Sequence, residues 1–309
     1  MNWVKEKFKE LKPKIISIFR VKVGPEGHLW QNCSCGTVLY KQDLEDNLFV
    51  CSVCKKHHPI TAKERFKIFF DNGYFQEIFP MLPVDDPLKF ADTRIYKVRL
   101  DNVREQTKRH DSVMLAEGLI NGIKVVAGIV DITFMDGSIG RAAGEAFLTG
   151  AEHALNYNLP YIFFCSGGDM RIQESTFSLI QASRMIAAIS LLKEKKIPYI
   201  PVCLDQTNGM ITGSIALIGD VNIAEPKAKV TFFSQKQIKE TTRDILPIEF
   251  QTAEYLLEKG QIDLIVERKD LPKTISTLIL IRTNQNKTFL SDATDYQSDF
   301  TGEASSFTS

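Results

Sequence analysis

The middle of the chain alternates between two periods of hydrophobic and polar positions, one typical of strands and the other typical of helices. Residues 112–122 and 123–134 are apolar runs that meet at Asn121-Gly122, a dipeptide that favours a tight hairpin. We therefore expect two adjacent strands there. Apolar residues at four-residue spacing then predict a helix over residues 144–158.

The same order of elements repeats further along the chain. Residues 160–165 predict a strand that stops at Gly167-Gly168, and residues 175–196 predict a helix whose last turn is basic, as the helix dipole favours. Residues 197–205 predict the next strand. Repeated strand, glycine turn and helix predict an α/β layered fold, in which a ligand binds at the carboxyl ends of the strands.

Composition divides the 309 residues into four segments. We expect a basic N-terminal segment (1–27), a cysteine-rich segment (28–60), the α/β domain (61–285) and a disordered polar tail (286–309). Lysine plus arginine equals aspartate plus glutamate at 38 each, so net charge predicts neither a nucleic-acid nor a membrane partner. No apolar run reaches the roughly 18 to 20 residues that span a bilayer.

Four of the six cysteines lie close together in the sequence, at Cys33, Cys35, Cys51 and Cys54. Such clustering favours a metal site in a cytoplasmic protein over a secreted disulfide framework. Four thiolates form a tetrahedral zinc set, which would be structural because no coordination position stays open. The first pair is one residue shorter than the usual knuckle. A degraded ribbon without metal, or a substitute ligand from His57 or His58, is the alternative.

Several motifs resemble the carboxyltransferase beta subunit of bacterial acetyl-CoA carboxylase, from about residue 27 to residue 266. They are the cysteine cluster with Trp30, GTVLYKQDLEDNLFVC, KKHHPITAKERF, FMDGSIGRAAGE, RIQES, ALIGDVNIAEPKA and FQTAEYLLEKGQIDLIV. The resemblance implies a crotonase-like (ClpP/crotonase) β-β-α superhelix, an α/β fold, with an N-terminal four-cysteine zinc ribbon.

The resemblance also implies an activity and partners. Carboxylate would pass from carboxybiotin to acetyl-CoA and give malonyl-CoA, a step of fatty acid biosynthesis. The implied partners are an alpha subunit of the same fold, in a heterotetramer of two alpha and two beta subunits, and a biotin carboxyl carrier protein. This chemistry needs no side-chain base, but backbone N–H donors must hold the enolate oxygen, and removing one typically costs about 3 to 4 kcal/mol.

Three glycine turns of the family each lose one glycine in this chain. The family stretch Ser-Ala-Ser-Gly-Gly-Ala-Arg-Met-Gln-Glu aligns its second glycine with Asp169, Thr-Met-Gly-Gly aligns it with Met210, and Phe-Met-Gly-Gly-Ser aligns its first with Asp136. By the same resemblance, the catalytic residues would be Gly168, Asp169, Gly209 and Met210. The substrate-binding residues would be Gly137, Ser138, Gly167, Arg171 and Gln173.

The replaced glycines leave several interpretations open. Asp169 and Met210 can still donate through their N–H groups if the turns accept an ordinary φ, whereas a positive φ would cost about 1 kcal/mol or more. Three roles are open for the Asp169 carboxyl: a base, a protonated donor, or a cap for the following helix. Cys165, beside a turn at a helix N-terminus, is a candidate thiol nucleophile, although a small packing residue fits the family's serine there.

These alternatives define three functional hypotheses. The leading one is the beta-type subunit of an acetyl-CoA carboxyltransferase. The second is a specialised paralogue that acts on acyl thioesters by decarboxylation or carbon–carbon bond formation in secondary metabolism. The third is a catalytically degenerate subunit that serves as a scaffold for an alpha-like partner.

Overall fold

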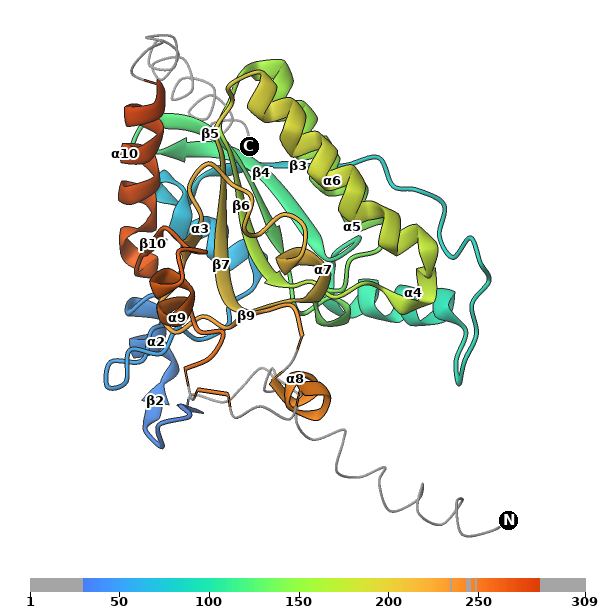
Figure 1. The fold of residues 1–309 in the computed structure, drawn as a ribbon, viewed down its shortest axis with the longest axis horizontal. Helices are drawn as coiled ribbons and strands as arrows, with labels where there is room; N and C mark the ends of the chain where they lie inside the picture. The colour runs from blue at the N-terminus through green and yellow to red at the C-terminus, as the bar shows by residue number, and fades with distance from the viewer. Residues whose placement is uncertain (1–29, 234, 243–245, 248, 284–309) are drawn as a thin grey trace, which may run out of the picture. The chain divides into compact units, whose positions relative to one another are not determined.

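The computed structural model describes residues 30–233, 235–242, 246–247 and 249–283. The expectations for the basic segment 1–27 and the tail 286–309 lie outside the described residues. Figure 1 shows the elements, which in chain order are β1 (Trp30–Asn32), β2 (Val38–Tyr40), α2 (Lys41–Asp46), α3 (Ala62–Phe69), η1 (Asp71–Gly73), β3 (Phe75–Ile78), α4 (Tyr96–Thr107), β4 (Val113–Ile120), β5 (Ile123–Val130), η2 (Met135–Gly137), α5 (Arg141–Tyr157), β6 (Tyr161–Gly167), η3 (Ile172–Glu174), α6 (Thr176–Glu194), β7 (Tyr199–Asn208), α7 (Gly209–Thr212), β8 (Ile223–Ala224), β9 (Val230–Thr231), α8 (Gln235–Thr242), α9 (Ala253–Glu258), β10 (Leu264–Ile265), η4 (Arg268–Asp270) and α10 (Leu271–Thr283).

The chain forms two compact units. In the described residues the smaller unit comprises 30–47 and 51–55, and the larger comprises 48–50 and the residues from 56 onward. In the smaller unit β1 and β2 pair antiparallel, and α2 follows β2 directly.

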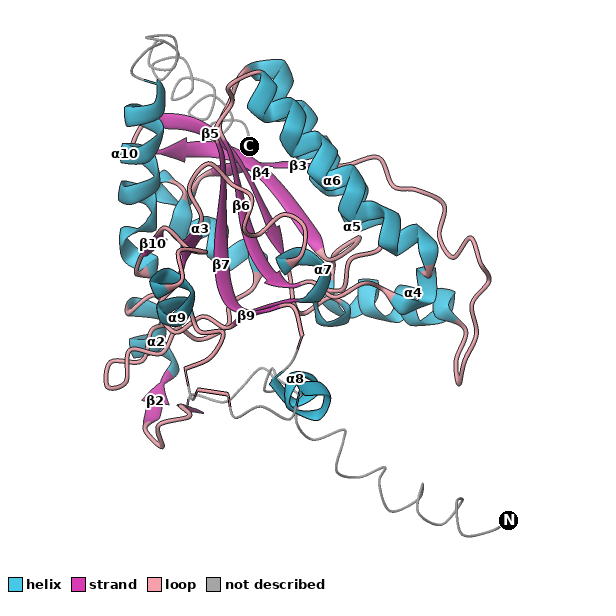
Figure 2. Ribbon diagram, in the orientation of Figure 1, coloured by secondary structure: helices cyan, strands magenta, loops and turns pink. Residues whose placement is uncertain are grey.

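The larger unit is built on one sheet, which has eight strands among the described residues (Figure 2). The strand order is β10-β8-β7-β6-β5-β4-β3, and β9 also pairs with β7. β4 pairs antiparallel with both β3 and β5, and the remaining pairs, from β5 to β10, are parallel. The predicted hairpin is confirmed, because β4 and β5 pair from Ile120 with Ile123 to Val113 with Val130.

Helices cover both faces of this sheet (Figure 1). Side chains alternate across a strand with a period of two, so Tyr161, Phe163 and Cys165 of β6 join the core with α5 and α6. Ile162 and Phe164 join the core with α3 and α10 on the other face. A parallel strand buried on both faces is apolar without a break, which is why this segment shows no alternation in the sequence.

The predicted helices and the position of the turns are also confirmed. The segments expected at 144–158 and 175–196 form α5 and α6. β5, β6 and β7 run parallel and are followed by η2, η3 and α7 respectively, so their turns lie at the same edge of the sheet. Within the described residues, no helix combines the length and the apolar character that crossing a bilayer requires.

A buried ion cluster connects parts of the larger unit that are far apart in sequence. Glu225, just after β8, contacts Arg65 of α3 and accepts hydrogen bonds at 3.1 Å from Nε and Nη2 of Arg268 in η4. Burial alone would raise the pKa of Glu225, but the Arg65 and Arg268 guanidinium groups hold it well below its usual range. Arg268 also donates to the carbonyl oxygens of Leu48 and His58, which fixes the start of this unit.

Candidate active site and metal centre

Three turns at the carboxyl edge of the sheet follow β5, β6 and β7. We call them the first turn (135–138), the second turn (167–171) and the third turn (208–211). They contain all nine residues expected in the active site except Gln173, which is half-buried in η3, immediately after the second turn.

Backbone hydrogen bonds join the three turns into one structure. Gly168 N donates to Gly137 O at 3.1 Å, and Ile139 N, just after the first turn, donates to Asp169 O at 2.8 Å. Ile211 N of the third turn donates to Gly168 O at 3.1 Å. The second turn is therefore held on both sides by backbone groups.

The glycines of the second turn are required by close packing as well as by conformation. Gly167 and Gly168 have φ of 55° and 98°. A Cβ on Gly167 would lie 2.7 Å from Asp136 O, and one on Gly168 would lie 2.1 Å from Ile211 Cγ1. No side chain fits in either place, which explains why this pair is glycine.

Three backbone N–H groups in the second and third turns have no acceptor among the described residues. They belong to Asp169, which lies outside helices and strands, and to Gly209 and Met210, the first two residues of α7, where a helix provides no acceptor for its own N–H groups. The Gly168 N–H, by contrast, is already used within the structure. The turns can therefore present donors to a bound oxygen atom, and these donors come partly from residues that are not glycine.

The three residues that replace glycine differ in the backbone conformation that their positions require. Neither Asp169 nor Met210 has a positive φ, so both fit their turns without strain. Asp136 has φ 57°, in the left-handed region that aspartate tolerates better than most residues. The cost expected for positive φ therefore does not arise at Asp169 or Met210.

The Asp169 side chain is not a helix cap and is not buried. Its Oδ1 accepts a hydrogen bond from Met170 N at 3.0 Å. α6 begins later, at Thr176, and its N-cap Ser175 makes no capping hydrogen bond through its side chain. The expectation of a capping role is thus wrong, because the chain passes through η3 before the helix starts.

Arg171 lies in the interior at the centre of a polar network. It donates to Asp111 Oδ1 at 2.7 Å and Oδ2 at 2.8 Å, to Ser138 O at 2.7 Å and Oγ at 3.2 Å, and to Glu174 Oε1 at 3.3 Å. Tyr96 OH donates to the same Glu174 oxygen at 2.6 Å. This network ties the first turn, the second turn and α4 together.

The network defines what Arg171 can do. Burial alone would lower its pKa, but the ion pair with Asp111 raises it, so the side chain stays charged. Its donors are all used by protein groups, which leaves none for a ligand. Asp111 and Tyr96 were missed by sequence reasoning, and the one available signal is that Asp111 stands just before an apolar strand.

Cys165 does not have the properties of a thiol nucleophile. It lies within β6 and is fully buried, and burial raises its pKa well above the ordinary value, with Cys203 on β7 adding to the shift. The expected lowering by a helix N-terminus is wrong, because the strand continues to Gly167 and the helix begins only at Thr176. Cys165 is a packing residue.

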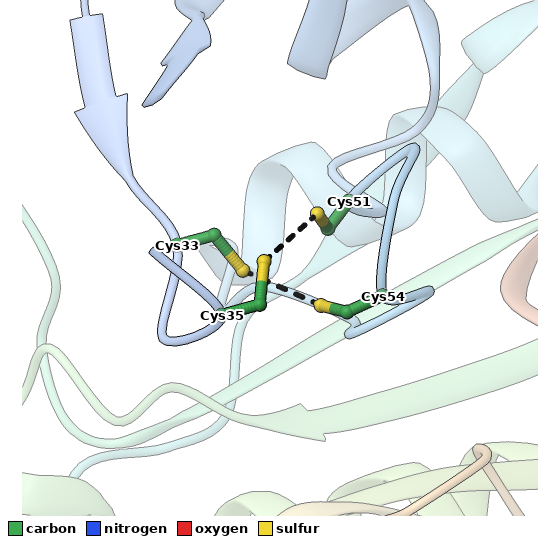
Figure 3. A group of neighbouring side chains, drawn as sticks. All are labelled: Cys33, Cys35, Cys51 and Cys54. Carbon is green, nitrogen blue, oxygen red and sulfur yellow. Dashed lines mark hydrogen bonds between the residues drawn. The ribbon is translucent and has the colours of Figure 1, made fainter. Parts of the chain in front are cut away.

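The four clustered cysteines form a second candidate site, in the smaller unit (Figure 3). Their Sγ atoms all lie within 4.8 Å of one another, with 3.5 Å between Cys33 and Cys54 and 4.0 Å between Cys35 and Cys51. Sulfurs at about 2.3 Å from a tetrahedral zinc are about 3.8 Å apart. The shortened first pair therefore still gives a set of the right size.

Electrostatics at this cluster also favour thiolates. A hydrogen bond with the Thr37 hydroxyl, 3.3 Å from Cys35 Sγ, lowers the pKa of Cys35 to about 6. Hydrogen bonding to the Cys54 backbone lowers the pKa of Cys51. His57 is not a member of the cluster, and its Nδ1 lies 3.0 Å from Glu225 Oε2 instead.

Comparison with known proteins shows the family of this chain. Residues 61–251 match the family described as carboxyl transferase domain. Over 301 residues the chain is 40% identical to the acetyl-coenzyme A carboxylase carboxyl transferase subunit beta of Pelagibacter ubique, covering 97% of each protein. The chain belongs to this carboxyl transferase beta subunit family. The Brucella abortus member is 40% identical over 287 residues, covering 92% of this chain and 94% of the relative.

Solved structures support the carboxyl transferase fold. The chain is similar to transcarboxylase 12S, with a TM-score of 0.55 and 28% identity over 71% of this chain and 40% of that one. A malonate decarboxylase hetero-dimer from Pseudomonas matches with a TM-score of 0.54 and 18% identity, over 78% of this chain and 95% of that one. At this low identity, the match supports only the mixed α/β fold. The carboxyl transferase match contains all three turns and the Arg171 network, whereas the cysteine cluster precedes it.

Proposed function

We propose that this chain is the beta-type subunit of a biotin-dependent acetyl-CoA carboxyltransferase, which forms malonyl-CoA. The observation that carries the proposal is that a chain matching this family over nearly its whole length holds unpaired N–H donors on the second and third of its three joined turns. Carboxybiotin, delivered by a carrier protein, would supply the carboxylate and then the base for the α-carbon proton. The protein's own task is to hold the thioester and stabilise its oxygen.

The donors of the second and third turns would stabilise the thioester oxygen as negative charge develops on it. Asp169, Gly209 and Met210 provide N–H groups that are fixed by the backbone and need no rearrangement during the reaction. Gly168 supports them indirectly, because its N–H and carbonyl hold the second turn between its neighbours.

The remaining site residues would shape and support the substrate-binding surface. Gly137 and Gly167 allow the first and second turns to approach each other, with 3.3 Å between a Cβ on Gly137 and Gly167 Cα. Ser138 and Arg171 hold these turns in place rather than contacting substrate. The Gln173 amide has no hydrogen-bond partner among the described residues, which leaves it for the substrate.

The proposal extends to the finer fold and to the metal. The strand and helix order, with turns at one sheet edge, supports a crotonase-like β-β-α superhelix. The size and low thiol pKa values of the cysteine cluster support a zinc ribbon in the smaller unit. Zinc there would be structural, since four thiolates complete its coordination.

The partners would be an alpha-type subunit, in a heterotetramer of two alpha and two beta subunits, and a biotin carboxyl carrier protein. One surface of the larger unit suits the alpha-type subunit. α6 follows the second turn and η3, and it exposes apolar side chains along its length, namely Phe177, Leu179, Ile180, Ile186 and Leu191. Exposed apolar side chains gathered on one helix favour a protein interface there.

The proposal is tested by reconstitution. The chain is combined with its alpha-type partner, the carboxylated carrier protein and acetyl-CoA, and malonyl-CoA is measured by mass spectrometry. Malonyl-CoA should form only when all four are present. Decarboxylation of malonyl-CoA without transfer to biotin would favour the paralogue hypothesis instead, and the absence of any reaction on the thioester would favour the scaffold.

A further inference from the structure

The Asp169 carboxylate lies directly against the third turn. Oδ1 is held by the Met170 N–H, and a Cβ on Gly209 would lie 2.7 Å from this oxygen and 3.0 Å from Asp169 Cγ. Because Gly209 has no side chain, the Asp169 carboxylate can occupy this space. Asp169 is exposed, and among the described residues no lysine, arginine or histidine forms an ion pair with it. Within the described part of the chain, the carboxylate is therefore held by the Met170 N–H and has no cationic partner.

This charge stands beside the donors assigned to the thioester oxygen. The carboxylate belongs to the residue that supplies one donor, and it packs on Gly209, which supplies another. An acyl group whose oxygen binds these donors would lie beside Asp169, because one donor belongs to Asp169 and another to Gly209, against which the carboxylate packs. The acetyl group is neutral and meets no repulsion, whereas the malonyl group carries a carboxylate and does. Two like charges that lie near each other in a partly hydrated site change affinity by about three- to tenfold.

We propose that the Asp169 carboxylate makes the site select against acyl groups that carry a negative charge, and so favours release of the carboxylated product. The inference rests on the proposed function, because it takes the turns to be the thioester site. Asp169 then has two separate roles: its N–H contributes to the donor set, and its side chain determines specificity. A change of the side chain alone separates them.

The test is equilibrium binding of two thioesters to the chain in complex with its alpha-type partner. Dissociation constants of acetyl-CoA and malonyl-CoA are measured by calorimetry for wild type and for Asp169→Asn, which keeps the N–H and removes the charge. The ratio of the malonyl-CoA constant to the acetyl-CoA constant should fall by about three- to tenfold, and the change should shrink in high salt. Asp101→Asn, an exposed charge on α4 with 58% side-chain exposure, is the matched control and should not change the ratio.

Several outcomes would overturn the inference. If the ratio in Asp169→Asn equals that of wild type, the charge has no role in selectivity. If transfer in Asp169→Asn slows by more than tenfold and Asp169→Glu restores it, the carboxylate is a base rather than a selectivity element. Both results leave the proposed function standing. Failure of wild type to bind either thioester would instead reject the proposed function, and this inference with it.

Discussion

By the resemblance given above, Asp136, Asp169 and Met210 align with glycines of the family pattern, and the structure separates these three residues by backbone conformation. Asp136 needs a left-handed φ, and aspartate is one of the few other residues that adopt it readily. Asp169 and Met210 need no such conformation. Because hydrogen-bond donors in the turns belong to the backbone, these replacements change the side chains around the site and leave the N–H groups available.

Replacing Met210 by proline tests the backbone donor itself. Proline is accepted in the first turn of a helix, where Met210 lies, but it has no N–H. We expect kcat for malonyl-CoA formation to fall by about 10²- to 10³-fold. In Met210→Ala, which keeps the N–H, kcat should fall far less. Circular dichroism melting would show that both variants fold, and equal losses would mean that the side chain matters rather than the N–H.

Replacing Asp111 by asparagine tests the network around Arg171. The fully buried guanidinium of Arg171 would lose its bidentate carboxylate partner and keep only the longer contact with Glu174, so the free energy of unfolding should fall by about 3 to 5 kcal/mol. Asp85→Asn is the control, because the Asp85–Arg104 pair has the same bidentate geometry but is partly exposed, and it should cost about 0 to 1 kcal/mol. If urea denaturation gave similar losses of unfolding free energy for the two variants, burial would not determine the cost of losing the ion pair.

At the scale of elements, the sequence correctly predicted the helices and strands that a local pattern of residues determines. The β4–β5 hairpin, β6, β7, α5 and α6 all follow from apolar runs, turn residues and helical spacing. Short elements such as β3, β9 and α7 carry no comparable signal, because they form against partners that the fold brings near.

The same limit applies to the candidate site. The glycine turns could be located from the sequence, because their residues resemble a family pattern and follow predicted strands. The partners of Arg171 could not, since Asp111 and Tyr96 are 60 and 75 residues away from it in the sequence. A buried charge selects its partner through the tertiary fold, which no local spacing encodes. The errors at Cys165 and Asp169 have a similar origin, namely the unexpected distance between β6 and the start of α6.

Assembly with the alpha-type subunit should depend on the exposed side of α6. Ile180→Glu places a charge among the exposed apolar side chains of α6, and this charge would have to be desolvated on association. We expect the affinity for the alpha-type subunit to fall at least tenfold, measured by analytical ultracentrifugation, with the melting temperature of the free chain nearly unchanged. Val98→Glu on α4 is the matched control, since both residues are 50% exposed. Equal effects of the two substitutions would exclude α6 as the interface.

At the scale of the whole molecule, the two units differ in how they are held together. The larger unit has apolar cores on both faces of its sheet and the buried Glu225 cluster. The smaller unit buries few side chains among its described residues, and they are Cys33, Leu39, Leu44 and Cys51. So small a core does not stabilise a fold by itself, and a metal supplies the missing free energy in proteins of this kind.

Zinc content therefore gives the decisive measurement for the smaller unit. We expect one zinc ion per chain by elemental mass spectrometry, and its loss in Cys51→Ser, because a serine hydroxyl does not replace a thiolate ligand. Cys203→Ser is the matched control: Cys203 is equally buried but lies in β7 of the larger unit, so this variant should keep its zinc. Chelation should change the fluorescence of Trp30, whose ring lies 5.2 Å from that of Tyr40 between β1 and β2. Wild-type protein without zinc, or an equal zinc content in both variants, would show that the cysteine cluster is not the metal site.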